Sequence, residues 1–196
     1  MTHQLYREEE PGDGAAEQDV PRHSGPVTRA GTCGGQPLYL GVDPGLRRTG
    51  YALLDRTPGG PVLREGGVIR SKAGDSLARR VYEIGSGLKE VLEEFRPWAM
   101  AIEQVFSLGR NPKSALLMAH ARGAILMAAA ELDVPVLHYT PTQVKKLLTG
   151  SGKANKLQMQ QAVQSELKLP QILEPNDVAD ASAVAVCLYY SVRFAA

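Results

Sequence analysis

The sequence Leu-Tyr-Leu-Gly-Val-Asp-Pro-Gly (residues 38–45) opens the folded part of the chain and indicates its fold class. Its first five residues form a short apolar run, which is typical of a buried β-strand. The Asp-Pro-Gly that follows predicts a turn, because proline cannot continue a sheet ladder and glycine allows close backbone approach. The chain therefore starts with a strand that presents a carboxylate, Asp43, at its end.

The segments after this strand predict an α/β protein with a mixed five-stranded sheet flanked by helices. The turn at 58–61 joins two further strands and suggests an antiparallel meander. Ser76 is a suitable N-cap, and Pro112 suits the first position of a helix. Strands are predicted at 38–42, 50–54, 63–70, 99–103 and 135–139, and helices at 76–95, 112–131, just after 141, 154–167 and 177–194.

Residues 1–36 differ in composition from the rest and predict a disordered N-terminal tail before a single domain over 37–196. They are rich in Gly, Pro, Glu and Asp, and such a segment buries too little apolar surface to offset its ordering entropy. The tail holds six acidic and three basic residues, which leaves 19 of the 22 basic and 15 of the 21 acidic residues in the domain. A modestly basic domain is compatible with phosphate binding.

The remaining composition predicts a reduced, cytoplasmic protein. Charged residues make up 22% of the chain, no apolar run is long enough to span a membrane, and the N-terminus lacks a secretory pattern. The two cysteines, Cys33 and Cys187, lie far apart and supply neither a disulfide framework nor a zinc site.

Two acidic residues end predicted strands. Asp43 follows the first strand, and Glu103 ends the apolar run at 99–102. An acid at the end of a buried strand is costly unless it is paired or bound to a metal. Each has an ordinary alternative: Asp43 could simply start a turn, and Glu103 could simply reach the surface.

A second pair of acids, Asp177 and Asp180, has i, i+3 spacing on the last predicted helix, so both lie on one face. Acids near a helix N-terminus favour the helix dipole, which explains one aspartate better than two on an otherwise apolar helix. Four carboxylates without histidine or cysteine beside them suit Mg²⁺ or Mn²⁺. Two such ions about 4 Å apart activate water and stabilise an in-line phosphoryl displacement, so the pattern indicates a metal-dependent nuclease.

The motifs at 40–45, 49–51, 101–106, 121–123 and 177–181 together strongly resemble the RuvC-type Holliday junction resolvases. The resemblance runs in order over about 38–194. It implies an RNase H-like fold, a homodimer, and hydrolysis of DNA phosphodiesters in four-way junctions with two metal ions. It assigns metal binding to Asp43, Glu103, Asp177 and Asp180, and it implies a branch-migration helicase complex as a partner.

The resemblance also implies DNA contacts. Phe106 would stack on or wedge between bases at the junction centre, although it could instead be a core aromatic residue. Lys145 and Lys156 match basic positions of the family near the cut. Weaker candidates for phosphate contacts, each of which could be an ordinary solvated side chain, are Arg110, Lys113, Lys146 and Lys153.

Other functions fit the sequence less well. An actin-like ATPase also begins with an Asp-x-Gly turn, but it needs a second phosphate loop and an adenosine pocket that this chain does not offer. A related RNase H-like nuclease acting on another branched DNA or on RNA would share the carboxylates. A binding module without activity is hard to reconcile with four acids all present. We therefore expect a junction endonuclease of recombination and repair.

Overall fold

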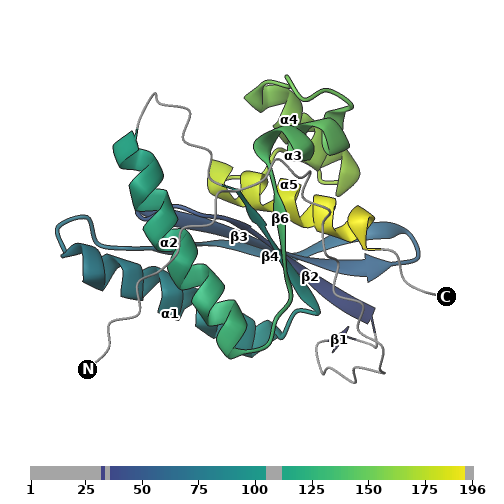
Figure 1. Cartoon of the computed structure of the whole chain (residues 1–196). Coiled ribbons are helices and arrows are strands. Elements are labelled where there is room, and N and C mark those ends of the chain that lie inside the picture. Colours follow the sequence, from purple (N-terminus) through teal and green to yellow (C-terminus); the bar gives the residue numbers. More distant parts are fainter. Residues whose placement is uncertain (1–31, 34–35, 105–111, 193–196) are drawn as a thin grey trace, which may run out of the picture.

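The structure is a computed structural model that describes residues 32–33, 36–104 and 112–192. A central sheet is covered by helices on both faces (Figure 1). Its strands run in the order β4-β3-β2-β5-β6, with the short β1 paired to β2. The strands are β1 (Thr32–Cys33), β2 (Gln36–Asp43), β3 (Arg48–Thr57), β4 (Gly60–Arg70), β5 (Ala99–Glu103) and β6 (Val136–Tyr139). The helices are α1 (Leu77–Phe95), α2 (Pro112–Glu131), α3 (Pro141–Thr149), α4 (Lys156–Glu166) and α5 (Asn176–Ser191).

The strand directions bring several chain segments to one edge of the sheet. Strands β2, β3 and β4 are antiparallel neighbours, whereas β5 pairs parallel to β2 and β6 parallel to β5. The C-terminal ends of β2, β4, β5 and β6 and the start of β3 therefore lie at the same edge, which we call the carboxyl edge. Open α/β sheets place their ligand sites at such an edge.

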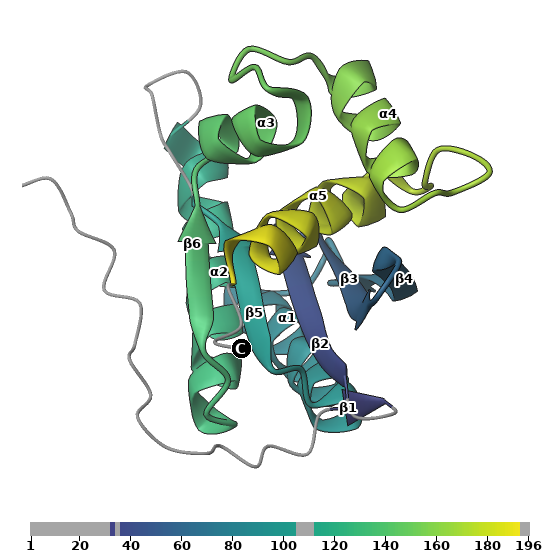
Figure 2. The same ribbon diagram turned by 90° about the vertical axis from the view of Figure 1, so that its right-hand side faces the viewer.

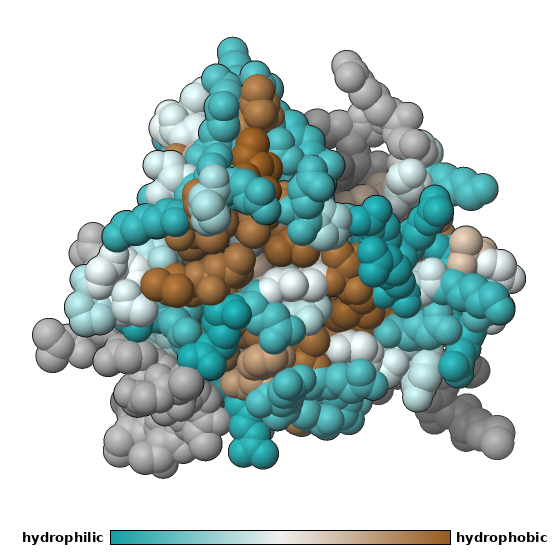
Figure 3. All heavy atoms as spheres, turned by 180° about the vertical axis from the view of Figure 1, so that it is seen from behind, coloured by the Kyte–Doolittle hydropathy of each residue, from teal (hydrophilic) through white to brown (hydrophobic). Residues whose placement is uncertain are grey.

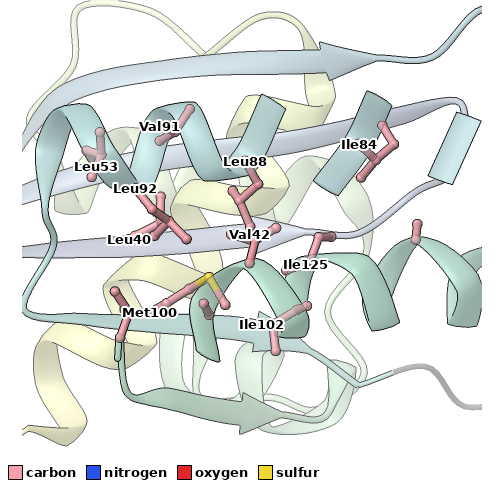
Figure 4. Packing of buried hydrophobic residues seen from close by; sticks show 14 of the residues in the cluster. Leu40, Val42, Leu53, Ile84, Leu88, Val91, Leu92, Met100, Ile102 and Ile125 are labelled. Atoms are coloured by element: carbon pink, nitrogen blue, oxygen red, sulfur yellow. The ribbon is translucent and has the colours of Figure 1, made fainter. Parts of the chain in front are cut away.

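The two faces of the sheet pack against different helices. Along β2, Leu40 and Val42 point into a core shared with α1 and α2, whereas Tyr39 belongs to the core under α5. This follows from the two-residue period of a strand. Figure 4 shows the first core, in which Leu88 and Leu92 of α1 lie over the sheet residues. Figure 2 shows α5 crossing the other face, with α3 and α4 beyond it.

Two glycines let α5 lie unusually close to the sheet. A Cβ at Gly41 would come within 2.2 Å of the Ala181 carbonyl oxygen, and one at Gly50 within 2.0 Å of the Asp177 carbonyl oxygen. Only glycine leaves the backbones free to approach this closely. The N-terminal part of α5 is thereby pressed against β2 and β3.

The far end of α5 is fastened by Arg56 of β3. Its guanidinium lies over the Tyr189 ring, 4.6 Å from the centroid, and donates hydrogen bonds to the carbonyl oxygens of Tyr189 and Val192 at 3.2 and 3.3 Å. The same group lies 5.9 Å from the Tyr39 ring centroid. Cation–π contacts and charged hydrogen bonds are each stronger when shielded from water.

The predicted elements are confirmed, with differences at their ends. Helix α2 has the predicted bounds, and the Ser76 hydroxyl accepts from the Arg79 backbone N–H at 3.3 Å, as an N-cap does. Helix α5 ends at Ser191, earlier than predicted, and α4 starts after an Asn155 cap rather than at 154. The small strand β1 lies inside the predicted tail. The sequence did not predict it, because its two residues have no strand pattern of their own and are ordered by pairing with β2. The rest of the predicted tail, residues 1–31 and 34–35, lies outside the described residues.

The surface is not uniformly polar. On the face opposite to that of Figure 1, hydrophobic side chains gather in the middle and hydrophilic ones surround them (Figure 3). In the described part of the chain no helix is both long and apolar enough to cross a membrane. The buried Cys187 carries no disulfide.

Candidate active site

Asp43 and Glu103 lie next to each other at the carboxyl edge. The parallel ladder of β2 and β5 pairs Val42 with Ile102, and each acid is the next residue on its strand. Adjacent strands lie about 4.8 Å apart, so the two carboxylates start from neighbouring backbone positions. The predicted sharing of one sheet edge is confirmed.

The turn after Asp43 is fixed by a buried threonine. The Thr49 hydroxyl donates to the Gly45 carbonyl oxygen at 2.8 Å and accepts from the Gly45 N–H at 3.3 Å. Thr49 is fully buried, and Gly50 pairs with Asp43 across the two strands. These contacts hold the end of β2 and the start of β3 together, which sets the direction of the Asp43 backbone.

Asp177 and Asp180 reach this edge from α5. Asp177 lies in the first turn, where a carboxylate is favoured by the helix dipole, and Asp180 lies one turn further on the same face. Each has a cationic partner: Arg48 Nη2 lies 2.5 Å from Asp177 Oδ2, and Lys156 Nζ lies 3.6 Å from Asp180 Oδ2. The close contact of α5 with Gly50 is what brings Asp177 to the start of β3.

The four acids act on one another electrostatically. Burial raises the pKa of Asp43 to about 7, and the charges of Glu103, Asp180 and Asp177 add to the increase, while Lys156 opposes it. Burial likewise raises the pKa of Glu103 to about 7, with Asp180 adding and Lys145 opposing. The pKa of Asp180 is also raised, mainly by burial. Such clustered, perturbed carboxylates are typical of functional sites.

The donor set fits Mg²⁺ or Mn²⁺ held by few protein ligands. Among the residues that the structure describes, no three His, Cys, Asp or Glu side chains are close enough to hold one ion together. Mg²⁺ commonly takes only one or two carboxylates and completes its shell with water and substrate phosphates. Burial is the main cause of the raised pKa values of Asp43 and Glu103, and Lys156 and Lys145 oppose it only in part, so a divalent cation would supply further counter-charge.

The predicted DNA-binding residues divide into three groups. Lys145 and Lys156 lie close enough to lower the pKa of Glu103 and of Asp180, respectively. Three others are exposed, and none of the ion pairs among the described residues joins them to the four acids: Lys113 near the start of α2, Lys146 in α3, and Lys153 in the loop before α4. Phe106 and Arg110 lie outside the described residues.

Residue-by-residue reasoning did not single out two arginines beside the acids. Arg48 pairs with Asp177, a residue distant in sequence. Arg122 of α2 donates from Nε to the Glu103 carbonyl oxygen at 3.3 Å, and its Nη2 lies 2.5 Å from His138 Nδ1 on β6. Arg122 lies in one of the motifs that carry the family resemblance, which was the only available signal. Arg48 had none, because the pair forms only when α5 folds onto β3.

A mixed sheet with four carboxylates at its carboxyl edge, covered by helices on both faces, defines the class of RNase H-like nucleases. Residues 39–188 match the family described as "Crossover junction endodeoxyribonuclease RuvC", and the chain belongs to this family. A relative of that description from Rhodopirellula baltica is 49% identical over 157 residues, covering 80% of this chain and 88% of the relative. One from Moorella thermoacetica is 43% identical over 76% of this chain and 89% of the relative.

Solved structures agree with this assignment. A structure described as "T. thermophilus RuvC in complex with Holliday junction substrate" matches with a TM-score of 0.72 and 34% identity, covering 79% of this chain and 94% of that chain. The yeast mitochondrial Holliday junction resolvase Ydc2 matches with a TM-score of 0.57 over 76% of each chain, and at 15% identity this likeness shows the fold alone. The RNase H-like fold expected from the sequence is confirmed.

Proposed function

We propose that this chain resolves four-way DNA junctions in recombination and repair by paired, metal-dependent hydrolysis of phosphodiester bonds. One observation carries the proposal: Asp43, Glu103 and Asp180, from two strands and a helix, share one electrostatic site. Family membership supplies the substrate class, since a matched relative's structure is described as a complex with a Holliday junction substrate.

The proposed metal ligands are Asp43, Glu103, Asp177 and Asp180. Two bound Mg²⁺ or Mn²⁺ ions would activate water and stabilise the attacking and leaving oxygens of the phosphate. The chain itself holds the carboxylates in place through the β2–β5 ladder and the close packing of α5. It also supplies Lys145 and Lys156 as cations beside the acids, where they would contact the phosphates on either side of the cut.

We assign Phe106 to stacking on an unpaired base near the junction centre. It follows Glu103 by three residues in sequence, so the catalytic strand leads directly into this segment. Stacking of a base on an aromatic side chain is worth about 1–3 kcal/mol. The secondary phosphate contacts are assigned to Arg110, Lys113, Lys146 and Lys153.

A homodimer is part of the proposal, because a C₂ dimer presents two sites to two like strands of the junction. Helix α2 supports it. Ala121 and Ala124 pack inward, and the Ala124 Cβ would lie 3.1 Å from a Cβ at Gly85 of α1. The opposite side of α2 leaves an exposed apolar stripe formed by Leu116, Ala119, Gly123 and Met127. We also propose a cytoplasmic location and a branch-migration helicase complex as a partner.

Cleavage of a synthetic four-way junction tests the proposal. With Mg²⁺ or Mn²⁺, we expect symmetric nicks in two opposing strands, mapped on a denaturing gel, and none with EDTA. A linear duplex of the same sequence and an RNA–DNA hybrid serve as competing substrates. Preferential cleavage of the hybrid, or junction cleavage in EDTA, would contradict the proposed function.

A further inference from the structure

A cluster of cations surrounds the β3–β4 end of the carboxyl edge. We call it the basic edge; it consists of Arg47, Arg48, Arg70, Lys72, Arg79 and Arg80. All except the partly buried Arg80 are exposed. The neighbouring acids are Asp75, Glu83 and Asp177, so six positive charges face three negative ones. The proposed function uses none of these six side chains.

Hydrogen bonds hold the basic edge together around the buried Ser71. The Ser71 N–H donates to the Arg47 carbonyl oxygen at 3.2 Å, and Arg80 Nε donates to the Ser71 hydroxyl oxygen at 3.1 Å. The turn after β2, the end of β4 and the start of α1 thus form one surface. The backbone positions of these cations are therefore fixed relative to one another.

The arrangement of these cations is electrostatically unfavourable for the isolated protein. Arg48 and Arg70 are direct partners in the antiparallel ladder of β3 and β4, and like charges placed opposite each other destabilise a sheet. Arg79 and Arg80 lie in the first turn of α1, where the helix dipole disfavours cations, and that turn contains no acid. Among the described residues, Glu83 pairs with Arg79 and Asp177 with Arg48, and no ion pair engages Arg70 or Lys72. A polyanion would relieve this repulsion.

The position of the basic edge identifies that polyanion. It begins four residues after Asp43, and β4 lies two strand spacings, about 10 Å, from β2. Phosphates of one DNA strand recur about every 3.4 Å along the duplex axis, so this distance spans about three nucleotides. Lys145 lies on the opposite side of the acids, near β5, and Figure 2 shows β3 and β4 on the other side of β2 from β5 and β6.

We infer that the basic edge binds the sugar–phosphate backbone of the duplex arm next to the cut. This inference rests on the proposed function, since it extends the path of the cleaved strand past the carboxylates. The arm continues over β3 and β4, and its phosphates lie on Arg70 and Lys72. The contacts are to phosphates, so they add affinity and orientation without sequence preference.

The test compares Arg70→Ala/Lys72→Ala with a charge-matched control, Lys89→Ala/Lys168→Ala. Lys89 pairs with Glu131 on the outer side of α1, and Lys168 bonds the Gly59 carbonyl oxygen, so both lie away from the edge. Each pair is made in an Asp43→Asn background, which keeps the DNA uncut. Fluorescence anisotropy then measures junction binding over a range of salt concentrations, with thermal unfolding as a check on folding.

We expect the log–log salt dependence of affinity to become less steep by about two for Arg70→Ala/Lys72→Ala, since each lost phosphate contact removes about 0.9. The control keeps the slope of its background. Equal slopes for the two double variants would overturn the inference. If the protein does not prefer the junction to a linear duplex, the proposed function fails instead, and the slopes on linear duplex still test the basic edge.

Discussion

The proposed active site consists of two unlike pairs of carboxylates. Asp43 and Glu103, the sheet pair, are side by side on strands. Burial raises the pKa of each to about 7; Glu103 and Asp180 add to the increase for Asp43, and Asp180 adds to it for Glu103. Asp177 and Asp180, the helix pair, are more exposed and carry their own cations, Arg48 and Lys156. The sheet pair therefore lacks counter-charge that the helix pair already has.

This difference suggests a division of labour in holding metal ions. An ion at the sheet pair would relieve charge that Lys145 and Lys156 offset only in part, so we expect the strongest binding there. An ion at the helix pair would compete with Arg48 and Lys156 for the carboxylate oxygens of Asp177 and Asp180. The sheet pair should thus dominate affinity, whereas the helix pair should complete the site.

The largest expected effect is on cleavage. Asp43→Asn should reduce the single-turnover cleavage rate by about 10³-fold or more, because metal-ion catalysis supplies several kcal/mol and each 1.36 kcal/mol is tenfold. Junction binding should remain, since phosphate contacts supply most of the affinity. Quenched-flow cleavage in Mg²⁺ measures the rate. Full cleavage by the variant would refute the assignment of the sheet pair.

The next largest effect is expected when the close packing of α5 against β2 is disrupted, because this packing holds the helix pair beside the sheet pair. Gly41→Ala places a methyl group within 2.2 Å of the Ala181 carbonyl oxygen, so α5 must move outward with the helix pair. Overpacking of this kind costs about 1–3 kcal/mol, and cleavage should fall further than folding alone explains. Urea unfolding and cleavage are compared with Gly74→Ala, where a Cβ meets nothing within 4 Å. Equal behaviour of the two variants would mean that α5 does not depend on this contact.

A pH-dependent effect follows for the sheet pair without metal. The pKa values of Asp43 and Glu103 are about 7 in the folded protein, against 3.8 and 4.5 for the free groups. The folded state therefore binds more protons between pH 4 and 7, and its free energy of unfolding falls as the pH rises through that range.

The pair Asp43→Asn/Glu103→Gln removes this dependence. In EDTA, the gain in stability of the double variant over wild type should grow from pH 5 to pH 8 by more than about 1.4 kcal/mol, the equivalent of one pKa unit. Urea unfolding at both pH values measures it, and adding Mg²⁺ at pH 8 should reduce the difference. A gain that is the same at pH 5 and pH 8 would contradict the uncompensated charge of the sheet pair.

The smallest expected effect concerns the cations of the helix pair. Arg48→Ala should lower the free energy of unfolding by less than about 1 kcal/mol, because partly exposed ion pairs contribute little. The Arg48 and Asp177 side chains are 41% and 23% exposed. Removal of Arg48 should at the same time tighten Mg²⁺ binding, which calorimetry on the DNA-free protein measures. Weaker Mg²⁺ binding would show that Arg48 orients Asp177 instead of competing for it.

The sequence predicted the elements better than the contacts between them. Pro112 and the Ser76 cap fixed helix starts, because capping is decided by local residues. Each of the four acids was ambiguous in the sequence when taken alone. Their assignment came from their joint occurrence at the ends of predicted elements and from the family motifs. The pairing of Arg48 with Asp177 could not be predicted, since it depends on how α5 lies across β3. The same holds for the role of Gly41, which looks like an ordinary strand residue until α5 is placed against it.

The Arg56 anchor at the far end of α5 has a consequence for the metal ligands. Asp177 and Tyr189 are twelve residues apart, about 18 Å along the helix. With one end held by Arg56 and the other pressed against Gly41 and Gly50, the helix is preorganised, and little conformational entropy is lost when ions bind. We therefore expect the rigidity of the proposed metal site to depend in part on a cation–π contact at the opposite end of the helix.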